Sequence, residues 1–468
     1  MASKKTVLII FFISGFVSLA LEIIWFRMLA LFIPVTAYAF AVMLVAVLAG
    51  ITIGSFVAHK LPKLSLAWLE TTIAFAIQAS LIILEIVYPF IKSVEVGNNL
   101  PLMIIASCIA IFPTTLLMGM AFPLGMKVWE KEVGKFYAVN VFGSILGALI
   151  GGFIMLPILG SQASLLLLAL ACLLCGMALQ AAWISRFIIL LCFAGVVLFV
   201  PGYYQTVLHY RYPGEKLLWL KEGIQTTVSI HENNSGFRIM YMDGRHQAED
   251  SPAVMAVHEQ IGGLPNQLFP QAKDALVIGL GGGVTPGVLS RNENLNIDIV
   301  ELSDTVVEGA RWFNHVNNKI LDQPNVKLIV DDGRNYLLKS LKRYDIITAD
   351  VIQPNHAGAG NLYSKEYFEL VKRSLKPGGI VVQWIGRRAE SQYKAIMRTF
   401  LDVFPNATLW ANGIIMVGSI DPIPNAPVAA SQMRDFVGPG PVLTDNRPFV
   451  EYYFLALPRG EEEIILTQ

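Results

Sequence analysis

The first 200 residues of this 468-residue chain contain very little charge. They hold ten Lys and Arg, six Glu and no Asp at all. So few charges over so long a stretch exclude an ordinary water-soluble domain and predict a membrane-embedded part. The remaining 268 residues carry 25 Lys and Arg and 29 Asp and Glu, which is typical of a water-soluble part.

The whole chain also lacks net charge, because 35 basic side chains balance 35 acidic ones. With no basic block anywhere, nucleic acid is not expected to be a partner. Hydrophobic residues make up 54% of the chain and the mean hydropathy is +0.55, which excludes intrinsic disorder.

Cysteine is scarce and confined to the apolar part. The chain has four cysteines, of which Cys172 and Cys175 form a CxxC inside a run of Leu and Ala. Without neighbouring His or acidic residues, this pair is interpreted as small lipid-embedded residues rather than a metal or redox site. The soluble part has no cysteine, so it is predicted to hold no disulfide, and no metal site is expected.

Seven apolar stretches are long enough to cross a bilayer core of about 30 Å. We expect them within residues 1–202, at about 6–33, 36–57, 66–92, 101–126, 137–160, 162–183 and 186–202. The first is too long for a signal peptide and lacks a small-residue cleavage site. The chain is therefore predicted to be a multi-pass cell-membrane protein whose first partner is the lipid bilayer.

The orientation predicted from charge conflicts with an odd number of spans. Eight Lys and Arg fall on the side of the N-terminus and two on the other, which favours a cytoplasmic N-terminus. Seven spans would then place the soluble part outside the cytoplasm. Either one stretch does not span, or the charge rule fails for this chain.

Small and ionisable residues stand out inside the spans. Gly143, Gly147 and Gly151 recur every four residues, a spacing that predicts close packing against another helix. The ionisable residues in or near spans are Glu22, Arg27, Glu70 and Glu85. Charge inside a membrane is costly and marks candidate functional positions, of which Glu85 is the first candidate to line a polar cavity. The alternative is that Glu22 and Arg27 pair near an interface and Glu70 lies at the start of a span.

The soluble part is expected to begin with a linker at 203–215 and a small β-region at 216–262. Two short alternating runs flank a turn at 233–236, which predicts a hairpin. From 263 to 468 the pattern changes to short strands separated by helices, with strands near 275–278, 296–300, 326–330, 344–347 and 379–383. This alternation predicts a doubly wound, parallel, Rossmann-like α/β sheet.

Ligands of such sheets bind beyond the carboxyl ends of the strands, and glycines and carboxylates are found there. Gly279 and Gly281 follow the first strand, where the absence of a Cβ lets a ligand approach the backbone. Glu301 ends the second strand, 22 residues after Gly279, as expected of a ribose-binding carboxylate. Asp332 follows the third. Together they predict an adenosine-containing ligand, with NAD and S-adenosyl compounds both open.

At this point the residues resemble a known family. The ordered series comprises Met242-Asp-Gly-Arg-His-Gln247, His258-Glu259, the glycine turn, Glu301, Asp332-Gly333, 344–350, 362–368 and Leu375-Lys-Pro-Gly-Gly-Ile380. This series resembles spermidine synthase, and with its apolar first part the chain resembles the integral-membrane spermidine synthase-like proteins. The resemblance implies an aminopropyltransferase that uses decarboxylated S-adenosylmethionine as co-substrate, with no tightly bound cofactor.

The resemblance also implies roles for individual residues. The nucleoside-binding residues would be Gln225, Gly279, Gly281, Glu301, Asp332 and Gly333. Asp350 would accept a proton from the attacking amine, which must be neutral to act as a nucleophile. His258 and Gln353 would lie near the amine acceptor. A small amine is thus the expected substrate, and a second copy of the chain a further partner, through either part.

Two departures from the family pattern concern the amine acceptor. Gly282 and Gln353 stand where the family has carboxylates, so the groups expected around a dicationic putrescine are reduced. Losing carboxylates that pair with a buried ammonium weakens diamine binding. The acceptor is putrescine or a related, less cationic amine.

Two other functions stay open from the sequence. One is an S-adenosylmethionine-dependent methyltransferase on the same fold. The other is a membrane transporter or scaffold whose soluble part senses a nucleoside. Because S-adenosyl donors are made in the cytosol, we expect the catalytic part to be cytoplasmic, against the charge count.

Overall fold

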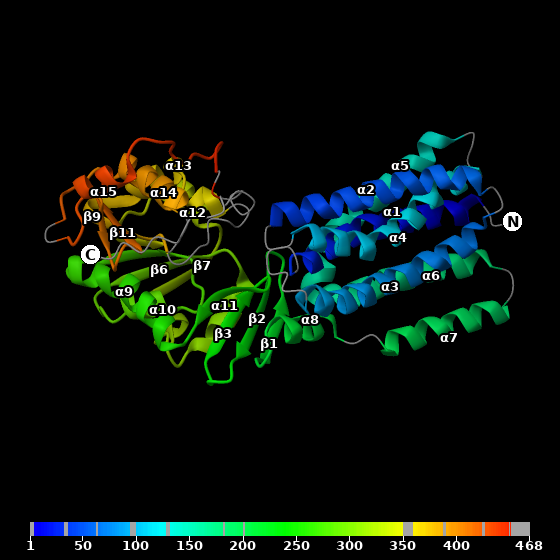
Figure 1. Ribbon diagram of the computed structural model, residues 1–468, viewed down its shortest axis with the longest axis horizontal. Helices are drawn as coiled ribbons and strands as arrows, with labels where there is room; N and C mark the ends of the chain where they lie inside the picture. The colour runs from blue at the N-terminus through cyan, green and yellow to red at the C-terminus, as the bar shows by residue number, and fades with distance from the viewer. Residues whose placement is uncertain are drawn as a thin grey trace. The chain divides into compact units, whose positions relative to one another are not determined.

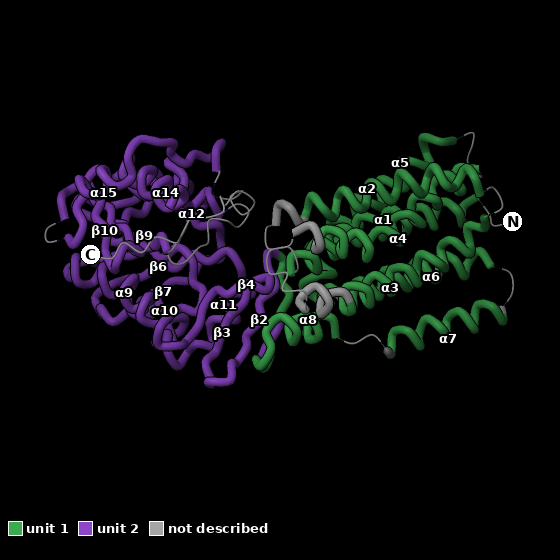
Figure 2. Tube along the Cα trace, in the orientation of Figure 1, with its two compact units in different colours: residues 1–217, 221–224 green, residues 218–220, 225–468 purple. Residues whose placement is uncertain are grey.

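The computed structural model describes most of the chain. The described residues are 4–31, 36–61, 64–93, 100–127, 132–180, 183–199, 202–349, 359–386, 390–423, 426–448 and 450. They form two compact units (Figure 2). Unit 1 comprises residues 1–217 and 221–224, and unit 2 comprises 218–220 and 225–468.

Unit 1 is built of helices (Figure 1). Their bounds are α1 Lys4–Leu29, α2 Thr36–Lys60, α3 Leu66–Ser93, α4 Leu100–Met126, α5 Val133–Ile150, a π-helical stretch Gly151–Met155, α6 Leu156–Leu179, α7 Trp183–Phe199 and α8 Tyr203–Arg211. By length and apolar composition, six helical segments among the described residues could cross a membrane.

One of these six segments contains a chain reversal. Residues 133–179 are 47 residues long, and a continuous helix of that length would measure about 70 Å against a bilayer core of about 30 Å. Gly160 interrupts the helix with φ 77° and ψ 170°, in a conformation that glycine adopts without a Cβ penalty. The part before Gly160 packs on α1, and α6 packs on α3. The segment thus supplies two apolar helices of spanning length.

The glycine spacing on α5 serves helix packing. A Cβ at Gly143 would lie 2.0 Å from the carbonyl oxygen of Phe12, and one at Gly147 would lie 2.0 Å from that of Phe16. Both carbonyls belong to α1, so only a residue without a side chain permits this approach. The interpretation of these glycines as a packing face is confirmed.

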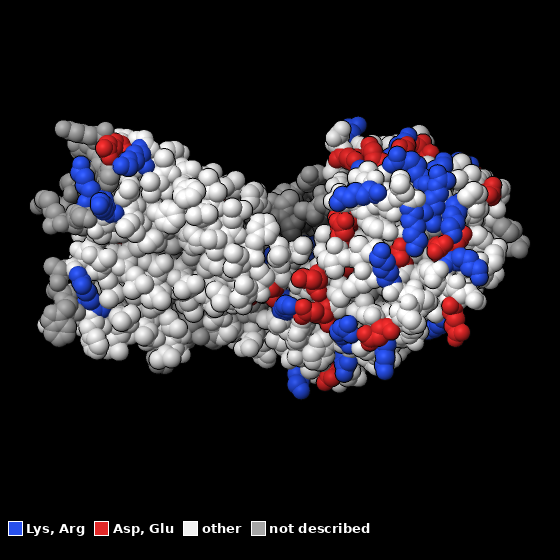
Figure 3. Space-filling model, turned by 180° about the vertical axis from the view of Figure 1, so that it is seen from behind, with Lys and Arg blue, Asp and Glu red and all other residues white. Residues whose placement is uncertain are grey.

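Charge is distributed between the units as the sequence predicts. On the face drawn in Figure 3, acidic and basic side chains crowd unit 2, while the sides of unit 1 are almost free of them. The segment expected to be a linker contains α8, whose Tyr203 side chain is fully buried in unit 1.

Unit 2 begins with a small sheet. Its four strands lie in the order β1 Lys216–Glu222, β2 Thr227–Glu232, β3 Arg238–Met242 and β4 Arg245–Glu249. Of β1, only residues 218–220 belong to unit 2, and the rest belong to unit 1. β2 and β3 form the expected antiparallel hairpin, with Ile230 opposite Met240. Helix α9, Pro252–Leu268, follows and continues through residue 263, where the sequence suggested a boundary.

A second, seven-stranded sheet forms the centre of unit 2. Its order is β10 Thr408–Trp410, β11 Ile415–Ser419, β9 Leu375–Trp384, β8 Tyr344–Ala349, β5 Asp274–Ile278, β6 Asn296–Glu301 and β7 Val326–Val330. The five strands β5 to β9 run parallel, as the strand–helix alternation predicts. β11 and β10 add antiparallel strands at one edge, so the sheet is mixed.

Helices cover both faces of this sheet (Figure 1). One face is packed by α12 Gly333–Lys339, α13 Lys365–Ser374, α14 Glu390–Val403 and α15 Ala430–Val437. The other is packed by α9, α10 Val284–Leu289 and α11 Asp304–Ala310. The strand order reverses between β5 and β8, and in such sheets the ligand crevice lies at that switch point.

Candidate functional site at the carboxyl edge of the sheet

The turn after β5 is the first component of the site. Three of its glycines have positive φ: Gly279 at 89°, Gly281 at 52° and Gly283 at 78°. Around Gly281, nothing in the described residues lies within 4 Å of where a Cβ would stand, so its backbone faces open space. Gly283 precedes the first residue of α10. The turn therefore presents bare backbone beside a helix start.

Glu301 lies next to this turn and is 7% exposed. Its Oε2 accepts a hydrogen bond from the backbone N–H of Leu280 at 2.8 Å, and its Oε1 accepts one from Ser303 at 3.0 Å. Burial raises the pKa of this carboxyl, and the backbone donors oppose the rise. Glu301 thus connects the glycine turn to the end of β6 by hydrogen bonds, and it lies at the carboxyl edge of the sheet.

Asp332 and Gly333 occupy the corresponding position after β7. Asp332 is the N-cap of α12, and its Oδ1 accepts from the backbone N–H of Asn335 at 2.8 Å. A Cβ at Gly333 would lie 2.5 Å from Cγ2 of Ile278, the last residue of β5. This glycine brings the start of α12 against the end of β5, so Asp332 and the glycine turn flank the same edge.

The predicted acceptor-side histidine is buried rather than open. His258 of α9 is 6% exposed, and its Nδ1 lies 3.0 Å from Oγ1 of Thr285 in α10. Gln225 is exposed, in the loop before β2. Asp243 fixes the start of β2, because its carboxylate accepts from Oγ1 of Thr226 and the N–H of Thr227, both at 2.9 Å.

Of the two positions where the family has carboxylates, the structure describes Gly282 but not Gln353. A Cβ at Gly282 would lie 3.1 Å from the Cβ of Ala248, which is tighter than ordinary van der Waals contact. Asp350 and Gln353 lie outside the described residues. Glu259, a candidate to supply the missing negative charge, forms a bidentate pair with Arg291 at 2.6 and 2.7 Å.

The structure adds residues that sequence reasoning did not select. Gln383, the residue before the last of β9, lies opposite Ala349, the last residue of β8, and is 1% exposed. Its Oε1 has no hydrogen-bond partner among the described residues. The sequence signal that could have identified Gln383 is a polar residue near the carboxyl end of a parallel strand. Arg334 pairs with Asp445, 111 residues along the chain, a contact that local pattern does not reveal.

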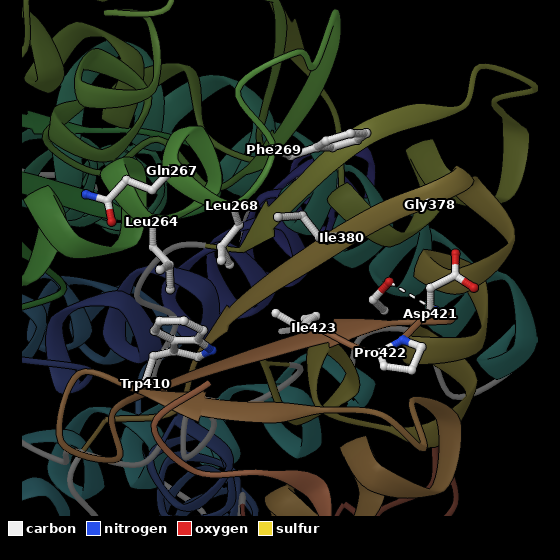
Figure 4. Close-up of a pocket in the computed structure, with 11 residues that line it drawn as sticks. Leu264, Gln267, Leu268, Phe269, Gly378, Ile380, Trp410, Asp421, Pro422 and Ile423 are labelled. Atoms are coloured by element: carbon white, nitrogen blue, oxygen red, sulfur yellow. Dashed lines mark hydrogen bonds between the residues drawn. The ribbon is translucent and has the colours of Figure 1, made fainter. Parts of the chain in front are cut away.

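A separate cavity is lined by residues of α9 and of the strands β9, β10 and β11 (Figure 4). Its volume is about 520 Å³, and Ile380 of β9 and Ser419 at the end of β11 line it. The side chains of Leu264, Leu268 and Trp410 point into it. None of the residues that line this cavity belongs to the glycine turn.

Comparisons with known proteins match the part of the chain that contains the glycine turn, Glu301 and Asp332. Residues 254–404 match the model of the spermine/spermidine synthase domain. A polyamine aminopropyltransferase of Shigella sonnei is 31% identical over 198 residues, which is 40% of this chain and 68% of that protein.

This chain belongs to the spermine/spermidine synthase family. A polyamine aminopropyltransferase of Escherichia fergusonii is 34% identical over 185 residues, 39% of this chain and 63% of that protein. One from Yersinia pseudotuberculosis is 32% identical, over 36% of this chain and 57% of that protein. The similarity thus spans less than two thirds of the length of these two synthase relatives.

Solved structures of the spermidine synthases are also similar. One is a crystal structure of spermidine synthase in complex with the transition state analogue AdoDATO. It is 19% identical to this chain, with a TM-score of 0.39, over 52% of this chain and 85% of that one. A structure of spermidine synthase from Thermotoga maritima is 20% identical, with the same TM-score and coverage.

Proposed function

We propose that unit 2 is an aminopropyltransferase that transfers an aminopropyl group from decarboxylated S-adenosylmethionine to a small amine, releasing methylthioadenosine. The observation that supports this most is the shared edge of the glycine turn, Glu301 and Asp332 in a chain of this family. Glu301 and Asp332 are the proposed ribose and adenine contacts. Gly279, Gly281 and Gly333 supply backbone that a nucleoside can approach, and Gln225 is proposed to complete the donor site.

The chemistry needs little apparatus beyond positioning. A neutral amine attacks the carbon next to the sulfonium, the carbon–sulfur bond breaks, and its electron pair leaves with the thioether. The attacking nitrogen then loses a proton, for which Asp350 is the proposed acceptor. β8 ends at Ala349, beside the switch point between β8 and β5, and Asp350 is the next residue in the sequence.

The acceptor is proposed to be less cationic than putrescine. Gly282 brings no carboxylate, Gln353 is neutral, and Arg291 already neutralises Glu259. Burying an ammonium group without a carboxylate partner costs on the order of several kcal/mol. A dicationic diamine is therefore a poor fit. His258, held by Thr285, is proposed to shape the acceptor end.

Product analysis tests the reaction. The purified full-length chain would be incubated with decarboxylated S-adenosylmethionine and a panel of amines, and separately with S-adenosylmethionine. Methylthioadenosine formation is expected, with putrescine used poorly. S-adenosylhomocysteine as product would identify a methyltransferase instead, and turnover of neither donor would favour a sensor. Mass spectrometry of any copurifying nucleoside gives an independent identification of the donor.

The role of Asp350 has its own test. In Asp350→Asn, turnover should fall by about 10²–10⁴-fold while donor affinity stays nearly unchanged, because only proton transfer is lost. If Asp350 instead caps the following backbone, the variant would lose donor binding and stability together. Gln353→Asp should improve the use of putrescine by restoring a carboxylate near the amine.

Unit 1 is proposed to anchor the chain in the cell membrane, since its helices have the length and composition for it. The catalytic unit is proposed to be cytoplasmic, where the donor is made. A second copy of the chain is proposed as a partner.

A further inference from the structure

Helix α3 carries a line of buried polar residues through the apolar unit 1. Glu70 is 1% exposed, Gln78 0% and Glu85 5%. Spacings of eight and seven residues place the three on one side of the helix. From Glu70 to Glu85 the line extends about 22 Å, at 1.5 Å per residue, which is most of a bilayer core.

These residues have oxygen atoms without hydrogen-bond donors. Among the described residues, Oε1 of Glu70, Gln78 and Glu85 has no partner. The same holds for two hydroxyl oxygens on helices that pack against α3, in Thr114 of α4 and Ser164 of α6. A buried carboxylate without a counter-charge is expensive and is retained where it has a function.

A hydrogen-bonded cluster lies on the helices α6 and α8, which both pack against α3. Thr71 of α3 faces Gly176 of α6, since a Cβ at Gly176 would lie 2.4 Å from Oγ1 of Thr71. α3 also packs against α8, and the hydroxyl of Tyr204 in α8 lies 3.4 Å from that of Ser161 near the start of α6.

Ser161 belongs to a network centred on Glu222. The carboxylate of Glu222 accepts hydrogen bonds from the N–H of Ser161 at 2.8 Å and from the hydroxyl of Tyr204 at 3.0 Å. Arg27 lies close by, donating from Nη2 to the carbonyl oxygen of Ile224 at 2.6 Å. The ionisable groups beside Glu70 are the thiols of Cys172 and Cys175, which supply no positive charge.

All five unpartnered atoms are oxygens; the three of the line are carboxyl or amide oxygens that accept hydrogen bonds, and the two hydroxyls can accept as well as donate. A cation that carries N–H or O–H groups satisfies both the charge and the hydrogen bonds, and an ammonium offers three donors. We propose that the α3 line, defined as Glu70, Gln78 and Glu85, binds and conducts a small donor-bearing cation, a protonated amine or a hydronium ion, through unit 1.

Conduction needs no net chemistry in this proposal. An amine enters and leaves with its proton, neutralising one carboxylate at a time. A hydronium ion transfers its proton to a carboxylate oxygen, and the same number of protons is released to water at the other end. The inference is independent of the aminopropyl reaction, because it rests only on residues of unit 1.

Flux through liposomes tests the proposal. The full-length protein would be reconstituted in vesicles of phosphatidylethanolamine and phosphatidylglycerol, and its flux compared with that of empty vesicles. Uptake of radiolabelled putrescine measures amine movement, and a trapped pH-sensitive dye measures proton movement. The wild-type protein should conduct one of the two. Glu70→Gln and Glu85→Gln should each reduce that flux by about tenfold or more, since each removes a charged acceptor.

Glu22→Gln is the matched control, because Glu22 is a half-buried carboxylate of α1 outside the line, and its flux should equal that of the wild type. Wild-type vesicles that conduct neither cation, or unchanged flux in both line variants, would overturn the proposal. Should a variant fail to fold by size exclusion, carbodiimide modification of Glu70 and Glu85 in the reconstituted wild type replaces it. Modified protein with undiminished flux would equally overturn the proposal.

Discussion

At the scale of single residues, the carboxylates at the proposed donor edge also make local structural contacts. Glu301 accepts from two backbone N–H groups, and Asp332 caps α12. Each therefore has a structural contribution that a binding assay alone would not separate from ligand contact. Stability and affinity must be measured on the same variants.

Glu301→Ala and Asp332→Ala should each weaken nucleoside binding at least about tenfold, as expected for a lost hydrogen bond to a charged group. Calorimetric titration with methylthioadenosine measures the affinity, and thermal unfolding measures stability. Glu259→Ala is the control, because in the described part of the chain that carboxylate forms its ion pair with Arg291 on the surface. Unchanged affinity in both site variants would refute the adenosine-site assignment.

Arg334 and Asp445 predict a pH effect on stability. The hydrogen bond from Arg334 holds the pKa of the Asp445 carboxyl below its usual value. A lowered pKa in the folded state stabilises the fold above the usual carboxyl pKa, and the contribution is lost as pH falls through the folded-state value. Both side chains are partly exposed, at 20% and 35%, so the pair contributes only about 1 kcal/mol.

Asp445→Asn should thus lower the unfolding temperature at pH 7 and have little effect well below pH 4, since the wild type also loses the charge there. Thermal unfolding of both proteins across this range gives the comparison. A deficit of the variant that persists undiminished in acid would show that packing, not charge, accounts for the contact.

At the scale of elements, two glycines with similar backbone conformation allow the effect of backbone strain to be measured apart from the effect of ligand approach. Gly281 and Gly378 both have positive φ, 52° and 74°, and both have open space where a Cβ would stand. An alanine at either position would have to adopt the same left-handed backbone conformation, which costs about 1–2 kcal/mol. Only Gly281 belongs to the proposed donor edge.

Gly281→Ala and Gly378→Ala should therefore destabilise unit 2 to a similar extent, while only Gly281→Ala weakens nucleoside binding. Unfolding temperatures and calorimetric affinities of the two variants measure both effects. Equal affinities would mean that the donor does not approach the backbone at Gly281.

The contact between α5 and α1 allows a second paired experiment. Gly147→Ala forces a methyl group onto the carbonyl of Phe16 and should cost about 1–3 kcal/mol, as in other overpacked interfaces. Gly152→Ala is the control, because its Cβ would meet Ile23 at an ordinary 3.7 Å. Thermal stability of the purified proteins in detergent is the measurement, and equal stabilities would contradict the close packing.

At the scale of the whole molecule, the reversal at Gly160 bears on topology. It makes two apolar helices of a segment that would otherwise count as one. With α1, α2, α3, α4 and α7, the described residues then offer an odd number of apolar helices. The N-terminus and unit 2 would lie on opposite sides of a membrane if every one of them spans.

A reporter fused after Gln468 tests the proposed cytoplasmic side. A reporter that is active only in the cytoplasm should give signal, because the donor is made there. Signal only from a reporter that requires the periplasm would instead support the excess of Lys and Arg on the side of the N-terminus. In that case, the source of an S-adenosyl donor outside the cytoplasm would become the next question.

The sequence by itself determined the division into an apolar and a charged part, the parallel strands β5 to β9 and the residues at their carboxyl ends. These features depend on local composition and on period, which short windows of sequence contain. The packing face of Gly143 and Gly147 was also predictable, since a four-residue spacing of glycine has few other uses in an apolar helix.

Tertiary structure alone decided which groups meet across long separations. It placed antiparallel β10 and β11 at the sheet edge, Arg334 beside Asp445, and the unpartnered oxygen of Gln383 beside β8. It also showed that Glu70, Gln78 and Glu85 are all buried on one helix, whereas sequence could name only isolated charges. Burial and partner choice depend on how distant segments pack, and no local pattern records that.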